Sequence, residues 1–407
     1  MSCCDKPGLM PVAEAIKQLL DSVTVTTATE QVSIVDALGR VLAEDVCSDV
    51  DVPPADNSAM DGYCLRFEDY QPGQPMQVSQ RIPAGVAPLP LEPGTLARIF
   101  TGAELPDNAD TVIMQEDVAA NEQGVSINEA PERGQHIRPR GQDIGRGQTI
   151  LTQGSRIRPQ DMGLLASVGV GEVRVYKPLR VAILSTGDEL VEPGIPLQKG
   201  QIYNSNRYTL IGLLRGLGLE ILDLGVVPDD VGATEAAFIK AASEADVVLS
   251  SGGVSVGEED HIKAVLEKLG SLAFWRLAIK PGKPFTLGRI MDTPFAGLPG
   301  NPAAVFVTFA LLCRPWLLKM QGARDYMPTE VLAPAGFSTR KPGGRQEYLR
   351  ARLVQSEQGG QVEIYPNQSS GVLFSASWGN GFAVVPPGQR VSEGDLVRFL
   401  PYEMILN

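Results

Sequence analysis

The chain has 407 residues, of which 43% are hydrophobic and 20% are charged. This composition is typical of globular proteins rather than of disordered or collagen-like chains, and the length predicts several domains. With 35 basic and 48 acidic side chains the formal net charge is −13, which argues against nonspecific nucleic-acid binding because that binding needs a basic surface.

The sequence gives no sign of a targeting segment. Residues 1–6 contain no apolar signal-peptide core, and the longest apolar run, 303–313 with one threonine, is about half the roughly 20 residues that a membrane span needs. The five cysteines include no CxxC pair, and His136 and His261 are too far apart in sequence to indicate a zinc site. We therefore expect a cytoplasmic protein with no membrane span and no nucleic-acid partner.

The first part of the chain predicts helices on both sides of a β-rich stretch. Apolar residues recur at helical spacing over 11–22, and a shorter helical pattern covers 34–42. From about 51 to 143, proline, glycine and short alternating apolar runs dominate, which predicts a β-rich inserted domain. The helical pattern returns over 159–168.

The stretch from 178 to about 321 alternates strands and helices. A continuous apolar strand at 181–184 is typical of a sheet that is buried on both faces. Further strands are expected at 220–226, 247–250 and 272–279 and at a segment that ends at Leu298; helices are expected at 208–217, 233–243, 260–269 and 302–320. This alternation predicts a doubly wound α/β domain.

After Pro328 the helical period disappears. Strand-like segments at 347–354, 362–365, 382–385 and 395–399 are separated by Pro-Gly and Gly-Gly turns. We expect a small β-barrel or β-sandwich domain here, so that the fold class is multidomain α/β plus β.

Polar loops follow two predicted strands of the α/β stretch. Thr186-Gly187-Asp188-Glu189 comes after the first strand, and Ser251-Gly252-Gly253-Val254-Ser255 comes after the strand at 247–250. Ligands bind at the carboxyl ends of parallel strands, where backbone N–H groups can approach an anion and carboxylates can hold a cation. A polar turn is an equal alternative for the first loop, whereas nearby Gly257 and Asp260 favour a phosphate loop for the second.

Basic residues form two local clusters in this acidic chain. Lys280 and Lys283 flank Pro281-Gly282, and a proline-stiffened loop would hold both ammonium groups near one place, although a solvated turn is the commoner fate of such a pair. The segment from Arg138 to Arg140 is the densest basic spot, and arginine binds oxyanions through its planar fork. From its residues alone, the polar loop that contains Asp61 is interpreted as a turn.

Taken together, seven motifs resemble, in the same order, those of the molybdopterin molybdotransferase family, which includes bacterial MoeA proteins and the E-domain of gephyrin. They extend over nearly the whole chain. The motifs are DNSAMDGY from Asp56, TGA from Thr101, RPRGQDI from Arg138, STGDEL from Ser185, SSGGVSVG from Ser250, KPGKP from Lys280 and LPGNP from Leu298.

The resemblance implies four domains: 1–50 with 145–177 as a discontinuous N-terminal or linker domain, 51–144 as the β-rich insertion, 178–327 as the molybdopterin-binding α/β domain and 328–407 as the C-terminal β domain. It implies a homodimer whose cleft joins the third domain of one subunit to the second domain of the other. The implied reaction is the Mg²⁺-dependent insertion of molybdate into adenylylated molybdopterin with release of AMP. The molybdopterin adenylyltransferase and cofactor-accepting enzymes are the further partners that it implies.

The resemblance also implies which residues form the cleft. Four carboxylates would be catalytic, namely Asp61, Asp143, Glu189 and Asp260, and the metal would be held by Glu189 and Asp260. Five residues would serve oxyanion binding: Lys280, Lys283, Pro284, Arg350 and Ser370. The other implied binding residues are Thr101, Arg138, Thr186, Gly187, Asp188, Asp229, Ser251, Gly252, Gly253, Ser255, Pro299, Asn301 and Pro302. Molybdate and a pyrophosphate both need cationic and N–H donors, and Mg²⁺ needs oxygen ligands.

Two positions depart from the family pattern: Asn204 stands where an aspartate is usual, and Ala304 stands where many members have a serine. Two other functions compete with this one. A non-catalytic scaffold of the gephyrin E-domain type would need none of the carboxylates and lysines that this chain keeps. A molybdopterin adenylyltransferase would need little beyond the α/β domain.

Overall fold

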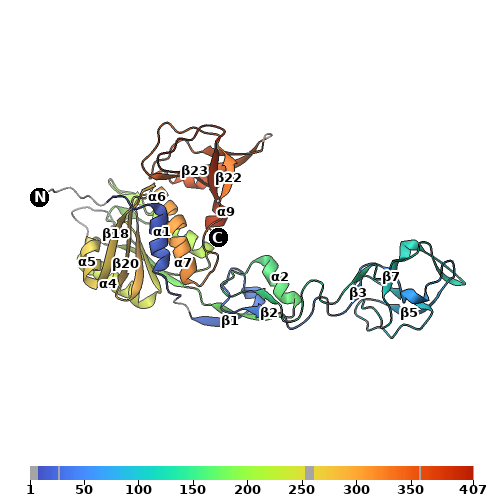
Figure 1. The fold of residues 1–407 in the computed structure, drawn as a ribbon. Coiled ribbons are helices and arrows are strands. Elements are labelled where there is room, and N and C mark those ends of the chain that lie inside the picture. Colours follow the sequence, from blue (N-terminus) through green and yellow to red (C-terminus); the bar gives the residue numbers. More distant parts are fainter. Residues whose placement is uncertain (1–7, 26–27, 253–260, 357–358, 407) are drawn as a thin grey trace.

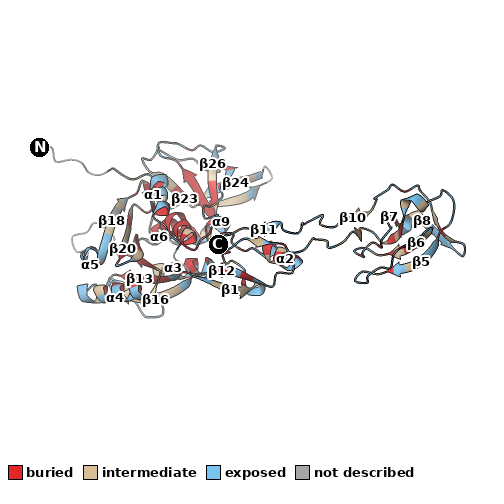
Figure 2. Ribbon diagram, turned by 60° about the horizontal axis from the view of Figure 1, so that its bottom comes forward, coloured by how far each residue is buried: buried red, intermediate tan, exposed pale blue. Residues whose placement is uncertain are grey.

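The computed structural model describes residues 8–25, 28–252, 261–356 and 359–406. The molecule is elongated: a large lobe at one end holds the α/β and C-terminal parts, a small region follows it, and a separate β-rich region forms the other end (Figure 1). The buried residues concentrate in the large lobe, and the β-rich region is joined to the rest by two extended segments (Figure 2).

A six-stranded sheet in the order β16-β13-β17-β21-β20-β18 forms the centre of the large lobe. Four neighbouring strands are parallel: β16 (Glu220–Val227), β13 (Arg180–Thr186), β17 (Val247–Ser251) and β21 (Thr293–Leu298). The remaining two, β20 (Pro284–Ile290) and β18 (Gly270–Arg276), pair in antiparallel fashion. Strand β20 is absent from the strands expected from the sequence. Short connections on both sides of it can join only antiparallel neighbours, which explains the change of direction.

Helices cover both faces of this sheet, as a doubly wound domain requires. On one face lie α1 (Val12–Asp21), α3 (Ser205–Gly216) and the long C-terminal helix of the domain, and on the other lie α4 (Val231–Glu244) and α5 (His261–Leu269). Helix α1 contributes Val12, Ala15 and Leu19 to the α/β core. It therefore packs with the α/β domain, although it belongs to residues 1–50, which are expected to be part of the N-terminal domain.

The longest helix runs from Pro302 to Met320 as α6 (Pro302–Thr308), the π-helical η4 (Phe309–Cys313) and α7 (Arg314–Met320). The wide turn lies just before Pro315, whose nitrogen has no hydrogen to donate to the preceding turn. This helix is long and apolar enough to cross a bilayer, but 94% of its apolar window is buried inside the protein. It is therefore the core helix of the large lobe.

The small middle region is built from segments that precede and follow the β-rich insertion. Strand β1 (Thr29–Ser33) pairs with β12 (Glu172–Tyr176), β2 (Val46–Cys47) pairs with β11 (Thr149–Leu151), and α2 (Pro159–Ser167) packs beside them. The prediction of a helix at 34–42 was wrong. Only the short 3-10 helix η1 (Ile34–Asp36) forms, and the backbone at Val41 and Leu42 makes β-bridges instead. Bridges to Arg156 and Val175 outweigh the weak local helical pattern.

The β-rich insertion contains a four-stranded sheet in the order β5-β6-β4-β7 and a separate hairpin. The two segments that lead into it pair as β3 (Asn57–Ser58) with β10 (Ile137–Arg138). The sheet strands are β4 (Gly62–Leu65), β5 (Gln77–Ile82), β6 (Thr95–Ile99) and β7 (Thr111–Met114); the hairpin is β8 (Val118–Asn121) with β9 (Gly124–Ile127); short 3-10 turns are η2 (Phe67–Asp69) and η3 (Gln115–Asp117).

The C-terminal domain is a second six-stranded sheet, and a strand from the α/β stretch joins it. The order is β19-β23-β25-β26-β22, and β24 pairs with β23 on the same side as β19, farther along the strand. A bridge between Ala335 and Val362 links the end of β22 to β24, so the sheet curls into a barrel-like shape. The elements are β19 (Ile279–Lys280), β22 (Val331–Pro334), β23 (Gln346–Ser356), β24 (Gly359–Ile364), β25 (Gly381–Val385), β26 (Leu396–Pro401), α8 (Phe374–Trp378) and α9 (Tyr402–Leu406).

Candidate functional site

The predicted loops of the α/β domain meet at one edge of its sheet. Because β13, β16, β17 and β21 are parallel, their carboxyl ends lie together. The chain passes from β13 to β16 on one side and reaches β17 on the other side of β13. Such a reversal of direction opens a crevice beside the strand ends, which is where open α/β sheets bind ligands.

Three of these loops touch one another. The hydroxyls of Ser185 and Ser251, at the ends of β13 and β17, lie 3.1 Å apart. Gly252 has φ +89°, and a Cβ there would lie 2.9 Å from the carbonyl oxygen of Thr186. A Cβ on Gly300, in the loop after β21, would lie 3.9 Å from the Cα of Gly252. Position 252 requires glycine because of this positive φ and the close carbonyl oxygen of Thr186, so the Ser251-Gly252 turn brings backbone rather than side chain to the crevice.

The hydroxyl of Thr186 has no hydrogen-bond partner among the described residues, although Thr186 is only 8% exposed. A buried hydroxyl normally has a partner. At the end of β13, beside Gly252, this hydroxyl is available to a ligand in the crevice.

Three carboxylates lie on the loops around this crevice. Asp188 accepts a hydrogen bond from the backbone N–H of Asp229 at 3.2 Å, which joins the loops after β13 and β16. The carboxylate of Glu189 folds back over Gly187, where a Cβ would lie 2.5 Å from Oε2. Within the described residues, no three His, Cys, Asp or Glu side chains converge in a group that could hold a metal ion. The expected site residues Gly253, Ser255 and Asp260 lie outside the described part of the chain.

A second group gathers around the start of α6. The backbone N–H of Ala303 donates to the carbonyl oxygen of Ser370 at 2.9 Å, which brings the C-terminal domain to the loop Pro299-Gly300-Asn301-Pro302. The backbone of Gly282 packs against the side chain of Thr308 on α6. The two loops that contain Lys283 and Ser370 therefore lie on the same helix.

Arg350 reaches this group from β23, where it is only 1% exposed. Its Nη2 donates to the carbonyl oxygen of Ser369 at 3.0 Å, and its Nε donates to the Ser375 hydroxyl at 2.9 Å. Burial lowers the pKa of this guanidinium. No carboxylate of the described residues forms an ion pair with Arg350, and a buried cation without a counter-charge favours a nearby anion.

The two lysines of the Lys280-Pro281-Gly282-Lys283 loop differ. Lys280 pairs with Glu347 at 3.1 Å, across the β19–β23 contact, whereas Lys283 has no ion pair within the described chain. Pro284 follows as the first residue of β20. Lys280 also lines a cleft of about 340 Å³ whose other cationic side chains are Arg340, Lys341 and Arg345. Of the two lysines, Lys283 is therefore the one whose ammonium group is available to bind an oxyanion.

The remaining predicted residues lie in the β-rich insertion. Asp61 accepts two hydrogen bonds through Oδ1, from the backbone N–H and from the hydroxyl of Thr101, each at 2.7 Å. Arg138 stands opposite Asn57 in the β10–β3 pair, and Gly102 donates to Ser58 at 2.8 Å, so Thr101 and Arg138 flank the same segment.

Asp143 lies nearer the middle region, where its backbone N–H donates to Val52 at 2.9 Å. The whole insertion is distant from the α/β sheet of the same chain (Figure 1). One chain therefore holds the predicted site in two separated halves.

Two asparagines at the start of α3, the N-cap Asn204 and Asn206, extend the first half and were not among the predicted site residues. Asn204 is 1% exposed and caps α3 by accepting from Arg207 at 3.2 Å, while its Nδ2 has no partner in the described chain. Asn206 donates to the carbonyl oxygen of Gly300 at 2.7 Å. An asparagine before a helical pattern is a recognisable N-cap signal, but the tie to Gly300 depends on the tertiary fold. Ala304, the second departure from the family pattern, is buried in α6.

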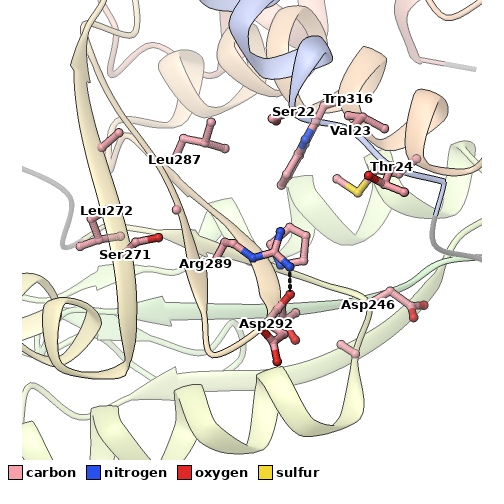
Figure 3. Close-up of a pocket in the computed structure, with 16 residues that line it drawn as sticks. Ser22, Val23, Thr24, Asp246, Ser271, Leu272, Leu287, Arg289, Asp292 and Trp316 are labelled. Atoms are coloured by element: carbon pink, nitrogen blue, oxygen red, sulfur yellow. Dashed lines mark hydrogen bonds between the residues drawn. The ribbon is translucent and has the colours of Figure 1, made fainter.

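A pocket of about 630 Å³ lies at the opposite edge of the sheet (Figure 3). Asp246 and Asp292, which line it, precede β17 and β21, so it opens at the amino ends of these strands. Arg289 extends across the pocket and donates to the carbonyl oxygen of Asp292 (Figure 3). This pocket contains none of the predicted site residues. Open α/β sheets bind ligands at the carboxyl ends of their strands, so the carboxyl edge of the sheet is the better candidate site.

Three family models match successive parts of the chain. Residues 10–169 match the family described as the MoeA N-terminal region (domain I and II). Residues 182–319 match the probable molybdopterin binding domain, and residues 333–402 match the MoeA C-terminal region (domain IV).

Similar proteins match over the full length. A molybdopterin molybdenumtransferase of Haemophilus influenzae is 43% identical over 98% of this chain and 100% of its own length. One from Nostoc is 38% identical over 95% of this chain and 92% of its own length. Among solved structures, a molybdopterin biosynthesis MoeA protein from Pyrococcus horikoshii OT3 has a TM-score of 0.83 at 31% identity and covers 97% of this chain and 100% of its own.

Proposed function

Because the chain belongs to the MoeA family of molybdopterin molybdenumtransferases, we propose that it inserts molybdate into adenylylated molybdopterin and releases AMP. The observation that carries the proposal is the meeting of two groups at the carboxyl edge of the α/β sheet. One is the crevice at Thr186 and Gly252, and the other is the cationic group around α6. The first suits a phosphate-bearing substrate, and the second suits a tetrahedral dianion.

The residues divide into two tasks. Thr186, Gly187, Asp188, Asp229 and the Ser251–Gly253 turn with Ser255 bind and orient the adenylylated substrate. Lys283, Arg350 and Ser370 hold molybdate beside the start of α6, with Lys280, Pro284, Pro299, Asn301 and Pro302 shaping that pocket. Asp61, Thr101, Arg138 and Asp143 complete the cleft from the β-rich insertion.

Mg²⁺ is proposed as the cofactor, with Glu189 and Asp260 as its protein ligands. Mg²⁺ in phosphoryl chemistry commonly takes one or two carboxylates plus substrate phosphates, so it needs no cage of three protein ligands. Exposed Asp188, Glu189 and Asp229 around the crevice supply suitable oxygen donors. When bound, the ion would neutralise the charge that develops on the pyrophosphate as AMP leaves.

The distance between the two halves within one chain supports a homodimer in which each cleft is completed by the partner subunit. We propose that the dimer works in the cytoplasm, between the molybdopterin adenylyltransferase that supplies its substrate and the enzymes that accept the finished cofactor.

A direct assay tests the function. The purified protein is mixed with adenylylated molybdopterin, Mg²⁺ and molybdate, and AMP release and cofactor formation are followed together. Molybdate-dependent AMP release with equal formation of cofactor is the expected result. AMP release without cofactor, or no reaction at all, would contradict the proposal.

Lys283→Ala is expected to raise the molybdate requirement by about tenfold or more. Hydrogen bonds to charged groups contribute roughly 1.5–3 kcal/mol each, and about 1.4 kcal/mol corresponds to a decade in affinity. Affinity for the adenylylated substrate should hardly change, because its contacts lie around Thr186 and Gly252. Calorimetry with each ligand separately measures both effects.

Lys240→Ala is the matched control, since Lys240 is exposed on α4, on the other face of the sheet. Arg350→Ala should act like Lys283→Ala, but it also removes a buried side chain that bonds to Ser375, so its folding must be checked. Equal loss of both ligands, or loss of neither, would remove Lys283 from the molybdate site.

A further inference from the structure

Asp61 is held by segments that come from three parts of the β-rich insertion. Its side chain accepts both hydrogen bonds from Thr101, just after β6. Its backbone carbonyl accepts from the N–H of Gln115 at 3.0 Å, in η3, and the next residue, Gly62, begins β4. The position of this carboxylate therefore depends on how β4, β6 and η3 are fixed to one another.

One side chain, Arg98 on β6, spans the same three segments. Its Nη1 donates to the carbonyl oxygen of Gly62 at 2.7 Å, and its Nη2 donates to Oε1 of Gln115 at 2.5 Å. The guanidinium also stacks on aromatic rings, with its Cζ 4.6 Å from the ring centre of Phe100 and 5.2 Å from that of Tyr63. A planar fork with two fixed donors and two stacking faces is a geometry that lysine cannot reproduce.

We propose that Arg98 is a positioning residue: it holds the segments that carry Asp61 and Thr101 in the relative position that the reaction requires. This proposal rests on the proposed function, in which Asp61 and Thr101 belong to the cleft. Arg98 acts through the backbone of Gly62 and through Gln115, and a small displacement of a catalytic carboxylate can cost a large factor in rate.

The charge of Arg98 adds to this effect. The pKa of Asp61 is lowered below the ordinary carboxyl value first by the backbone N–H of Thr101, then by the Thr101 hydroxyl, and further by the positive charge of Arg98. Arg98 is thus the charged side chain that acts on Asp61 from the neighbouring strand. Its removal should loosen the segment and raise the pKa of Asp61 together.

Arg81 provides a matched control on the same sheet. It is the register partner of Arg98 on the neighbouring strand β5, and its Cζ lies 4.5 Å from the ring centre of the same Phe100. Unlike Arg98, Arg81 makes no hydrogen bond to the segments around Asp61 in the described chain. Replacement of Arg81 therefore removes a stacked arginine but leaves the hydrogen bonds of Arg98 to Gly62 and Gln115 in place.

The experiment labels threonine with ¹⁵N and follows the Thr101 amide while the pH is lowered, because this N–H reports protonation of Asp61. In Arg98→Met the midpoint should move to higher pH and kcat should fall by about tenfold or more, while the KM for molybdate stays near that of the parent. Arg98→Lys restores the charge but not the fork, so it should recover the midpoint more than kcat. Arg81→Met should behave as the parent in both measurements.

An unchanged Thr101 titration and kcat in Arg98→Met would overturn the proposal, as would equal effects in Arg81→Met. A shifted titration with unchanged kcat would show that the hydrogen bonds of Arg98 do not contribute to catalysis, and the proposal would be wrong. If the parent protein itself shows no turnover, the proposed function fails, and the Thr101 titration still decides whether Arg98 holds Asp61.

Discussion

Asp61→Asn and Glu189→Gln are each expected to lower turnover by about a hundredfold or more while the protein remains folded. The two carboxylates stand on opposite halves of the proposed cleft. An asparagine at position 61 keeps the oxygen that accepts both bonds from Thr101, so it removes charge rather than shape. Glutamine at position 189 likewise keeps the side chain that folds back over Gly187.

The pH dependence gives a second check on Asp61. Its pKa lies below the ordinary carboxyl value because of the two Thr101 hydrogen bonds and the nearby Arg98. A lowered pKa means that the ionised form is stabilised, and this contribution is lost only as the pH falls through that lowered pKa. The loss of turnover in Asp61→Asn should therefore be the same at pH 6 as at pH 8.

AMP release under saturating substrates, with thermal unfolding as a check on folding, measures both variants. Glu122→Gln is the matched control, because Glu122 is an exposed carboxylate on the turn between β8 and β9 in the same insertion. Parental rates in both Asp61→Asn and Glu189→Gln, with unchanged dependence on Mg²⁺, would show that these carboxylates do not serve the reaction.

The sequence predicted the parts of the fold that depend on local patterns. Buried strands such as β13 and β17 read as continuous apolar runs, and the helix from 302 to 320 begins with a proline, so both were found within a few residues of their observed limits. The loop motifs were placed at the carboxyl ends of these strands for the same reason. Parallel strands then bring such loops together without further information.

Features that depend on long-range contacts could not be predicted in this way. The pattern at 34–42 is helical by itself, but bridges from Val41 and Leu42 to distant strands prevail. Helix α1 was found, yet nothing local says that it packs in the α/β core. The pairing of Lys280 with Glu347, which distinguishes it from Lys283, and the tie from Arg98 to Gln115 both join residues whose proximity only the folded chain creates.

The separation of the two half-sites leads to the other large effect that we expect. If each cleft joins the α/β domain of one subunit to the insertion of its partner, the protein is a stable homodimer with an interface of the obligate class, above roughly 2,000 Å². Light scattering at micromolar concentration should give the dimer mass. The decisive test is a heterodimer of Asp61→Asn and Glu189→Gln subunits, made by co-expression with two affinity tags.

In that heterodimer one cleft carries both substitutions, and the other carries neither, because its Asp61 and Glu189 come from the two unaltered positions. The two substituted homodimers are inactive, but the heterodimer should show about half of the turnover of the unsubstituted dimer, because one of its two symmetry-related clefts is intact. Asp61→Asn paired with Asp143→Asn is the matched control. Both of these residues belong to the insertion, so each cleft contains one substituted carboxylate. Activity should therefore stay low. A cleft formed within a single chain would leave the first heterodimer as inactive as its parents, and a monomeric mass would exclude the shared cleft altogether.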